Sequence, residues 1–125
     1  MELGRQYGSQ ATSGSIWWIN GELGAGKTHW TKGFVSGLGS AAIVTSPTFG
    51  LLHEYTDGSI PAFHFDFYRL NSPEELLAMG WDEILDHDGI VIVEWGERFQ
   101  ELMPKGARQI NITALEDGRR RLEMS

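Results

Sequence analysis

Short apolar runs alternate with amphipathic stretches along the chain and predict an α/β protein. The mostly apolar run 15–20 precedes a glycine and predicts a buried strand. The unbroken β-branched run 89–95 is typical of a strand covered on both faces. Between these two runs, residues 27–38 carry apolar side chains at helical spacing, and Gly39 is a stop signal. The apolar face of that predicted helix consists of Trp30, Phe34, Val35 and Leu38.

Weaker patterns complete the predicted sheet and its helices. Asn71, Ser72 and Pro73 form a helix start, with Ser72 as the cap, and we expect that helix to end near Gly80. We also expect strands over 41–45, 51–55 and 60–68, with a turn over 56–59. A short helix is expected over 81–85, and a hairpin over 109–113 and 119–124. At the N-terminus we expect a helix over 2–7, followed by a linker over 8–14. The fold class is therefore α/β, with a mostly parallel central sheet and antiparallel additions.

A complete phosphate-binding motif lies between the first predicted strand and the helix that follows it. The pattern G-x-x-x-x-G-K-[ST] is matched by Gly21, Gly26, Lys27 and Thr28. Glycines let backbone N–H groups surround phosphate oxygens, and the helix points its N-terminus at the same anion. Lys27 supplies a charge for the β- and γ-phosphates, and Thr28 offers a hydroxyl to Mg²⁺. The predicted nucleotide-binding residues of this segment are Gly21, Glu22, Leu23, Gly24, Ala25, Gly26, Lys27 and Thr28.

Two carboxylates are candidates to complete this site. Glu94 ends an apolar run, where an ionised side chain is costly unless it is paired or near a metal. Asp66 lies between two phenylalanines and could bind Mg²⁺ through water or position the attacking water. Two structural alternatives stay open: Glu94 as a strand-end acid facing water, and Asp66 as the partner of Arg69 or His64. The candidate metal ligands are Thr28, Asp66 and Glu94, and the candidate catalytic residues are Lys27, Asp66 and Glu94.

Two further residues are candidates at the nucleotide site. Thr48 follows a proline after a predicted strand, where a threonine can sense the γ-phosphate, although the segment is equally compatible with a plain turn. Trp95 follows Glu94 directly, and its position alone favours a core residue on the opposite face or in the loop beyond. The histidines show no metal-ligand spacing, so the sequence assigns them no role as ligands.

Composition and charge narrow the classes of function. The 125 residues suffice for one domain, 1–125, and contain no cysteine. The net charge of −7 excludes binding of nucleic acid by bulk electrostatics. No apolar run is long enough for a membrane span, and we expect a cytoplasmic protein. The stretch 74–101 contains nine acids and one base, which fits either solvated helix faces or docking on a basic partner.

Four motifs together resemble one family. The phosphate loop at 21–28, Thr-Ser-Pro-Thr-Phe at 45–49, His-Phe-Asp-Phe-Tyr-Arg-Leu at 64–70 and Glu-Trp at 94–95 occur in the order of the TsaE family, also called YjeE. These are bacterial ATPases of tRNA threonylcarbamoyladenosine biosynthesis. The resemblance covers about residues 16–124. The phosphate loop alone is shared with many unrelated proteins, whereas the combination is specific.

The resemblance implies a P-loop NTPase-like three-layer sandwich that binds ATP with Mg²⁺ and hydrolyses it slowly alone. It implies action with a TsaB–TsaD heterodimer that modifies adenosine 37 of tRNA. The chain itself would then contact tRNA only indirectly, through the complex. By matching position, Lys27 and Thr28 would hold phosphates and Mg²⁺, and Thr48 would lie in a switch-like loop. Asp66 and Glu94 would serve Mg²⁺ and hydrolysis, and Trp95 would be a mobile residue at the site.

The chain departs from the family pattern in places. Family members usually carry an extra N-terminal strand and a longer helix before the phosphate loop, so residues 1–14 are predicted to be a shortened N-terminal element without the family's adenine-contacting threonine. His29 and Gly96 also differ from the commoner residues at these positions. Two other functions remain open: a small P-loop kinase, disfavoured because no arginine lies between Arg5 and Arg69, and a nucleotide-dependent binding module without useful catalysis.

Overall fold

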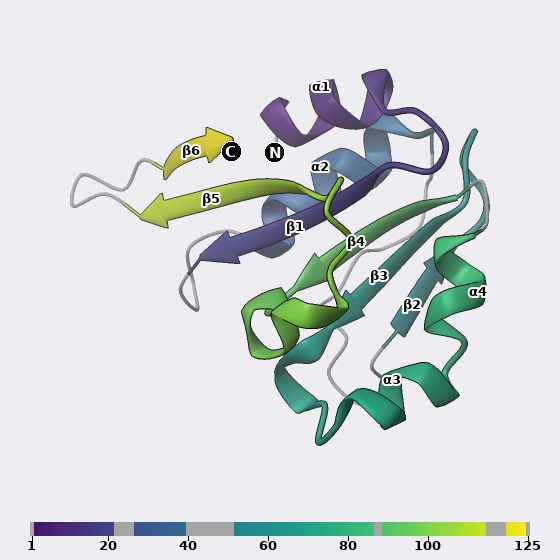
Figure 1. Cartoon of the computed structure of the whole chain (residues 1–125). Coiled ribbons are helices and arrows are strands. Elements are labelled where there is room, and N and C mark those ends of the chain that lie inside the picture. The colour runs from purple at the N-terminus through teal and green to yellow at the C-terminus, as the bar shows by residue number, and fades with distance from the viewer. Residues whose placement is uncertain (1, 22–26, 40–51, 87–88, 115–119, 125) are drawn as a thin grey trace.

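A single twisted sheet runs through the molecule. The computed structural model describes residues 2–21, 27–39, 52–86, 89–114 and 120–124. Within these ranges six strands form the sheet, in the order β2-β3-β4-β1-β5-β6 (Figure 1). The strands are β1 (Ile16–Gly21), β2 (Leu52–Tyr55), β3 (Ala62–Asp66), β4 (Ile90–Glu94), β5 (Arg108–Ala114) and β6 (Arg120–Met124). The middle four run parallel, and β2 and β6 pair antiparallel at the two edges.

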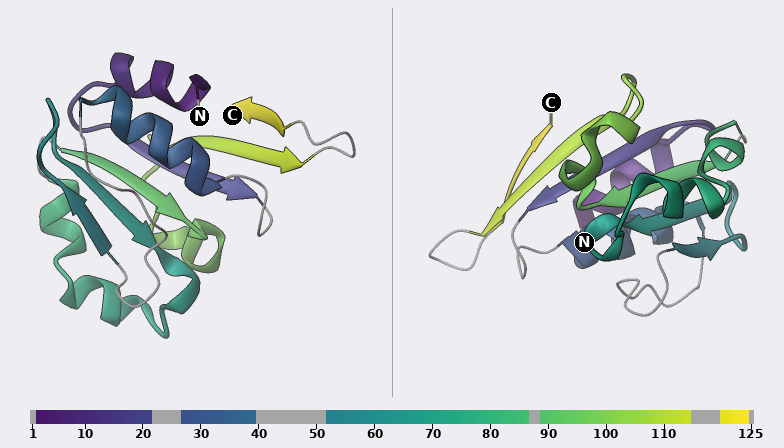
Figure 2. Two further views of the ribbon diagram at one scale, coloured as in Figure 1. Left: turned by 180° about the vertical axis from the view of Figure 1, so that it is seen from behind. Right: turned by 60° about the horizontal axis from the view of Figure 1, so that its bottom comes forward.

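Helices cover both faces of this sheet, which gives three layers. Helices α1 (Glu2–Gln10) and α2 (Lys27–Gly37) lie on one face (Figure 2). The other face is covered over β2, β3 and β4 by α3 (Pro73–Ala78) and α4 (Trp81–Leu85). Two 3-10 segments, η1 (Phe67–Arg69) and η2 (Gly96–Leu102), follow β3 and β4. The predicted fold class, a three-layer α/β sandwich with antiparallel additions, is confirmed.

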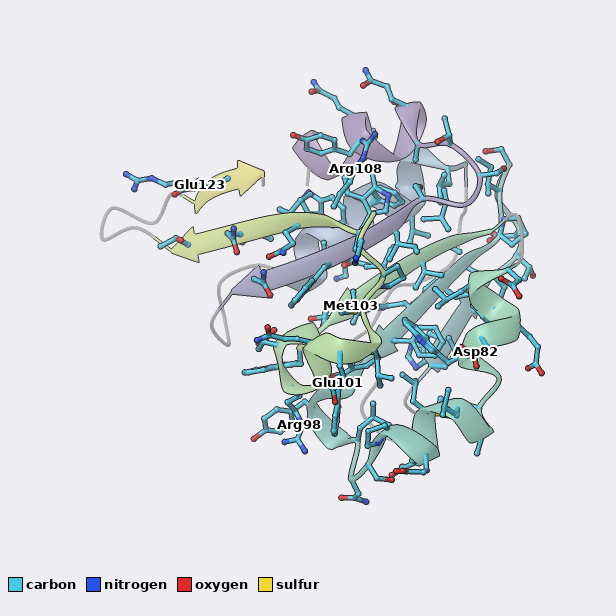
Figure 3. All side chains as sticks on the ribbon, viewed as in Figure 1. Asp82, Arg98, Glu101, Met103, Arg108 and Glu123 are labelled. Atoms are coloured by element: carbon cyan, nitrogen blue, oxygen red, sulfur yellow. The ribbon has the colours of Figure 1, made fainter. Side chains whose placement is uncertain are left out.

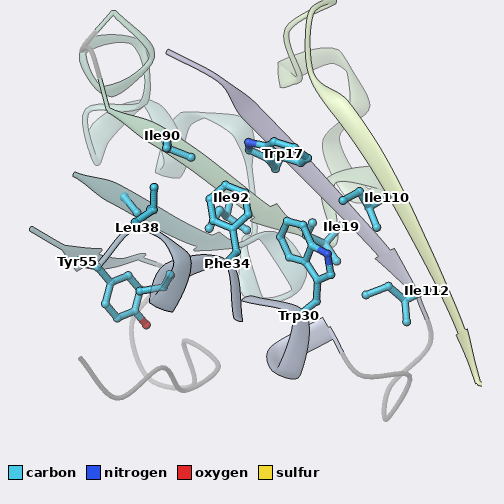
Figure 4. Packing of buried hydrophobic residues seen from close by; sticks show 12 residues of the cluster. Trp17, Ile19, Trp30, Phe34, Leu38, Tyr55, Ile90, Ile92, Ile110 and Ile112 are labelled. Carbon is cyan, nitrogen blue, oxygen red and sulfur yellow. The ribbon is translucent and has the colours of Figure 1, made fainter. Parts of the chain in front are cut away.

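The core under α1 and α2 is rich in aromatic rings (Figure 4). Trp17 of β1 meets Phe34 of α2 edge-on at 5.1 Å between ring centroids, and Trp30 stacks on Phe34 at 5.0 Å. Each such pair adds about 0.5–1.5 kcal/mol beyond the burial of its area. The predicted helix face of Trp30, Phe34, Val35 and Leu38 is therefore the face that packs on the sheet.

Alternation along β4 divides its side chains between two cores. Ile90 and Ile92 join the cluster under α2, and Val91 and Val93 join a second cluster with Leu76 of α3 and Trp81 of α4. All five residues of β4 are buried. An unbroken β-branched run is what a strand needs when both of its faces are covered. Among the described residues, no helix is both long and apolar enough to cross a bilayer.

The first helix is longer than the sequence predicts. We expected it to end near Tyr7 and a linker to start at Gly8, but α1 continues to Gln10. A Cβ on Gly4 would lie 2.3 Å from the Trp30 carbonyl oxygen, and one on Gly8 would lie 2.0 Å from that of Phe34. These glycines allow the backbones of α1 and α2 to touch. Tertiary packing therefore overrides their low helix propensity.

Strand β3 is shorter than predicted. The strand expected over 60–68 ends at Asp66, because the Asp66 carboxylate accepts the backbone N–H of Tyr68 at 2.9 Å and starts η1. The helix start at Pro73 is confirmed, although the side chain of Ser72 makes no capping hydrogen bond. The helix over 81–85 and the terminal hairpin are also confirmed. The strand expected over 41–45 lies outside the described residues.

We predict that Gly8→Ala destabilises the protein. The new methyl group would overlap the backbone of α2, and overpacking of this kind costs about 1–3 kcal/mol. The gain in helix propensity, about 1 kcal/mol, works in the opposite direction. Denaturant unfolding measures the net change. Gly106→Ala is the matched control, because a Cβ there meets nothing within 4 Å. A Gly8→Ala protein as stable as the unsubstituted one would contradict this packing.

Candidate functional site

The two ends of the phosphate motif lie at the edge of the sheet where the parallel strands have their carboxyl ends. Gly21 is the last residue of β1, and α2 begins at Lys27 and packs on the same strand. Because β1, β3, β4 and β5 are parallel, their carboxyl ends meet at this edge. The strand–motif–helix context that we predicted is thus present. Residues 22–26 and Thr48 lie outside the described residues, as do the side chains of Lys27 and Thr28.

Glu94 ends β4 at this same edge and is buried, with 4% of its surface exposed. Its Oε2 lies 2.6 Å from Nε2 of His64, a residue of β3 that is fully buried. The alternative of a strand-end acid facing water is therefore wrong. Glu94 lies beside Ile19 of β1 in the parallel register, two residues before the phosphate motif begins at Gly21. Its role toward a metal stays a prediction.

Asp66 lies directly beside Glu94. The two residues are register partners in the β3–β4 ladder, so their side chains leave the sheet on the same face. Alternation along β4 makes this the face covered by α2, because Ile92 packs there. Asp66 is 8% exposed, and one of its oxygens caps η1. The imidazole that we considered as its structural partner is bonded to Glu94 instead.

The donor set at this edge suits a hard divalent cation. Carboxylate oxygens are the ligands that Mg²⁺ prefers, and a nucleotide-bound Mg²⁺ takes only one or two of them together with phosphate and water oxygens. Within the part of the chain that the structure describes, no group of three or more His, Asp or Glu side chains could hold a metal ion. Asp66 and Glu94 are oxygen donors of the kind that Mg²⁺ takes when it is bound with a triphosphate.

Trp95 leaves the strand in an unusual backbone conformation. Its φ and ψ of 63° and 32° are left-handed, which is rare for a bulky residue and found mostly at functional or constrained positions. The conformation turns the chain from β4 into η2. The Trp95 ring lies 4.9 Å from that of Tyr68, which is 52% exposed and follows Asp66 closely in sequence. The Trp95 side chain packs against the cluster that contains Val91 and Val93, on the other face of the sheet from Glu94.

A hollow of about 850 Å³ opens on the other side of Trp95. It lies between the carboxyl half of β1, the neighbouring β5 and the start of η2. Asn20 and Gln109 are joined across its floor by a hydrogen bond of 3.2 Å. Trp18, Asn20, Trp95, Glu97, Gln109 and Asn111 are among its lining residues. Asn20, Gln109 and Asn111 make its wall amide-rich rather than basic.

Among the described acids of 74–101, Glu94 is buried and the others are exposed or partly exposed. Glu94 belongs to the site, whereas Asp82, Glu97 and Glu101 are exposed, and the positions of Asp82 and Glu101 can be followed in Figure 3. Arg98 is not a free charge on that surface. Its Nη2 donates to the carbonyl oxygen of Leu70 at 2.7 Å and so ties η2 to the end of η1.

Sequence reasoning considered His64 as a structural partner of Asp66 and missed its bond to Glu94. The histidines have no metal-ligand spacing that would have drawn attention to it. The useful signal is that His64 and Asp66 are two residues apart on a strand, which places them on one face. A polar residue on an otherwise apolar face needs a partner, and the acid at the end of the next strand provides it.

The strand order and the motif between β1 and α2 define a P-loop type of α/β protein. The sequence profile described as "Threonylcarbamoyl adenosine biosynthesis protein TsaE" matches residues 1–122. The chain belongs to the TsaE family.

Individual relatives agree with this assignment. A TsaE protein of Bacillus subtilis (strain 168) is 42% identical over 112 residues, which span 90% of this chain and 70% of the relative. That of Haemophilus influenzae is 41% identical over 82% of this chain and 65% of its own length. That of a Nostoc species is 40% identical over 100% of this chain and 78% of its own. A crystal structure of Bacillus subtilis YdiB superposes with a TM-score of 0.82 at 35% identity, covering 96% of this chain and 73% of that one.

We predict that Asp66 has a structural role that can be separated from its charge. Asp66→Ala removes the acceptor for the Tyr68 N–H and should cost about 0.5–2 kcal/mol, as loss of a helix cap does. Asp66→Asn keeps an acceptor oxygen at that place and should retain most of the stability. Thermal unfolding of the two variants tests this. Equal losses for both would show that the charge, not the cap, stabilises this turn.

Proposed function

We propose that this chain is an ATP-binding, Mg²⁺-dependent ATPase subunit of tRNA threonylcarbamoyladenosine biosynthesis. One observation carries the proposal. The strand–motif–helix unit and two buried carboxylates on adjacent strands share one edge and one face of the sheet, in a chain of the TsaE family. The names of the relatives connect those proteins with the same pathway.

The phosphate loop holds the triphosphate. Backbone N–H groups of 21–26 and the N-terminus of α2 bind its anionic oxygens, and Lys27 adds a positive charge at the β- and γ-phosphates. Such preorganised donors stabilise the charge that develops during phosphoryl transfer and need no reorganisation at that moment. Thr28, at the first turn of α2, provides a hydroxyl for the metal.

Asp66 and Glu94 supply the negatively charged side chains of the site. When Mg²⁺ is bound with ATP, it neutralises phosphate charge. Asp66 and Glu94 would hold it, directly or through water, and orient the water that attacks the γ-phosphate. Their burial strengthens these interactions, because the local dielectric constant is low.

The wider assembly is part of the proposal. We infer a TsaB–TsaD heterodimer as the protein partner, with tRNA contacted by the complex. The net charge of −7 and the exposed acids support a protein partner rather than direct tRNA binding by this chain. Thr48 is proposed as the residue that reports the γ-phosphate to that partner, and the setting as cytoplasmic.

The decisive experiment is reconstitution of tRNA modification over many turnovers, with and without this chain. Modification that stops after the first turnover in its absence supports the proposal. ADP release without an acceptor identifies an ATPase, whereas phosphate transfer that requires an acceptor identifies a kinase. Nucleotide binding without turnover, alone or with TsaB–TsaD, leaves a binding module and contradicts the catalytic part.

We predict that Lys27→Ala abolishes tight ATP binding. The ammonium group is the one full positive charge of the phosphate motif, and interactions of a charged donor with phosphate contribute about 1.5–3 kcal/mol each. Titration calorimetry with ATP and Mg²⁺ measures the loss. Lys32→Ala, further along the same helix, is the control and should bind normally. An unchanged affinity of the Lys27→Ala protein for ATP would refute this role.

We predict that Glu94→Ala reduces Mg²⁺-dependent hydrolysis more than it reduces ATP binding. The loop and Lys27 still hold the phosphates, whereas a carboxylate beside the metal is lost. Turnover and calorimetry on the same preparation separate the two effects. Equal losses of turnover and of affinity would count against a role of Glu94 in the reaction.

A further inference from the structure

The imidazole of His64 occupies a position where packing alone would favour an apolar side chain. It lies in the middle of β3, is fully buried, and faces the same way as Ala62 and Asp66. Ala62, together with Ile92 on the neighbouring strand, belongs to the hydrophobic core under α2. A polar group in such surroundings costs free energy unless it is hydrogen-bonded. His64 is therefore explained by its partner rather than by its volume.

That partner is Glu94. Nε2 of His64 lies 2.6 Å from Oε2 of Glu94, and the two side chains are 0% and 5% exposed. An ionised carboxylate only accepts hydrogen bonds, so Nε2 is the donor. The other ring nitrogen, Nδ1, has no partner among the described residues. Within the described part of the chain, the imidazole is therefore hydrogen-bonded through one nitrogen to one acid.

We propose that His64 is a positioning residue for Glu94. A glutamate has three rotatable side-chain bonds, and the bond to His64 fixes one carboxylate oxygen and therefore the orientation of the other, Oε1, at the carboxyl edge of the sheet. Hydrogen bonds from neighbouring groups orient carboxylates that serve metals in this way. The inference rests on the proposed function, because it takes Glu94 to act on Mg²⁺-bound ATP.

A pair of amide substitutions tests this role. The amide nitrogen of glutamine can occupy the place of Nε2, whereas that of asparagine reaches only the place of Nδ1. We expect His64→Asn to lose turnover by roughly 10–100-fold, the usual effect of removing a group that orients a metal ligand. We expect His64→Gln to recover most of it, with ATP affinity in the absence of Mg²⁺ unchanged in both. His64→Leu is the second loss variant, should the asparagine protein not fold.

Two controls separate positioning from general stability. Phe65→Leu disturbs the next residue of β3, which is buried on the opposite face, and should lower the unfolding temperature without a selective loss of turnover. In a Glu94→Ala background, His64→Asn should cause no further loss of turnover, because the group that it positions is gone. Full turnover in His64→Asn, no recovery in His64→Gln, or an undiminished further loss in the Glu94→Ala background would each overturn the proposal.

A readout that does not need hydrolysis keeps this test distinct from that of the proposed function. Absence of ATP hydrolysis by the unsubstituted protein, alone and with TsaB–TsaD, is a failure of the proposed function. The role of His64 is then decided by calorimetry of ATP with and without Mg²⁺. His64→Asn should weaken the Mg²⁺-dependent part of the affinity, and His64→Gln should retain it. An equal Mg²⁺ dependence in all three proteins would overturn the positioning role.

Discussion

Strand β4 pairs in parallel with β1 on one side and with β3 on the other, and the position of every candidate group follows from these two registers. Glu94 lies beside Ile19 and beside Asp66, so the strand that leads into the phosphate motif and both carboxylates finish at one edge. Hydrophobic burial of the four apolar residues of β4 fixes the register, because a slip by one residue would turn Glu94 and Ile92 to the other face. The apolar core under α2 therefore also fixes the positions of the two carboxylates.

Much of the fold was predictable from local pattern. The β-branched run of β4 predicts a strand that is covered on both faces. The phosphate motif predicts a strand before it and a helix after it, which are β1 and α2. Glu94 was identifiable as an acid at the end of an apolar run, and Asp66 as a lone acid between two phenylalanines. The sequence could not show that they are adjacent, because adjacency depends on strand order, and β3 and β4 are separated by 23 residues that include two helices.

Two errors have a common physical origin. Gly8 was interpreted as the start of a linker, and His64 was considered only as a partner of Asp66, because each was judged by its own propensity or by its neighbours in sequence. Gly8 stays helical because the backbone of α2 lies against it, and His64 is polar because Glu94 reaches it from another strand. In both cases a neighbour distant in sequence outweighs the local preference, which is the usual limit of reasoning from one sequence.

The contact between α1 and α2 has a consequence for how this part of the chain can change over time. Gly4 and Gly8 of α1 and Gly37 of α2 meet main-chain atoms of the opposite helix. In most hydrophobic cores, a substitution by a larger side chain can be compensated by a smaller side chain at a neighbouring position, so that the total volume is kept. Main-chain atoms cannot shrink, so no second substitution can compensate a larger residue at these three sites. Divergence should therefore spare them while the surrounding aromatic side chains are remodelled.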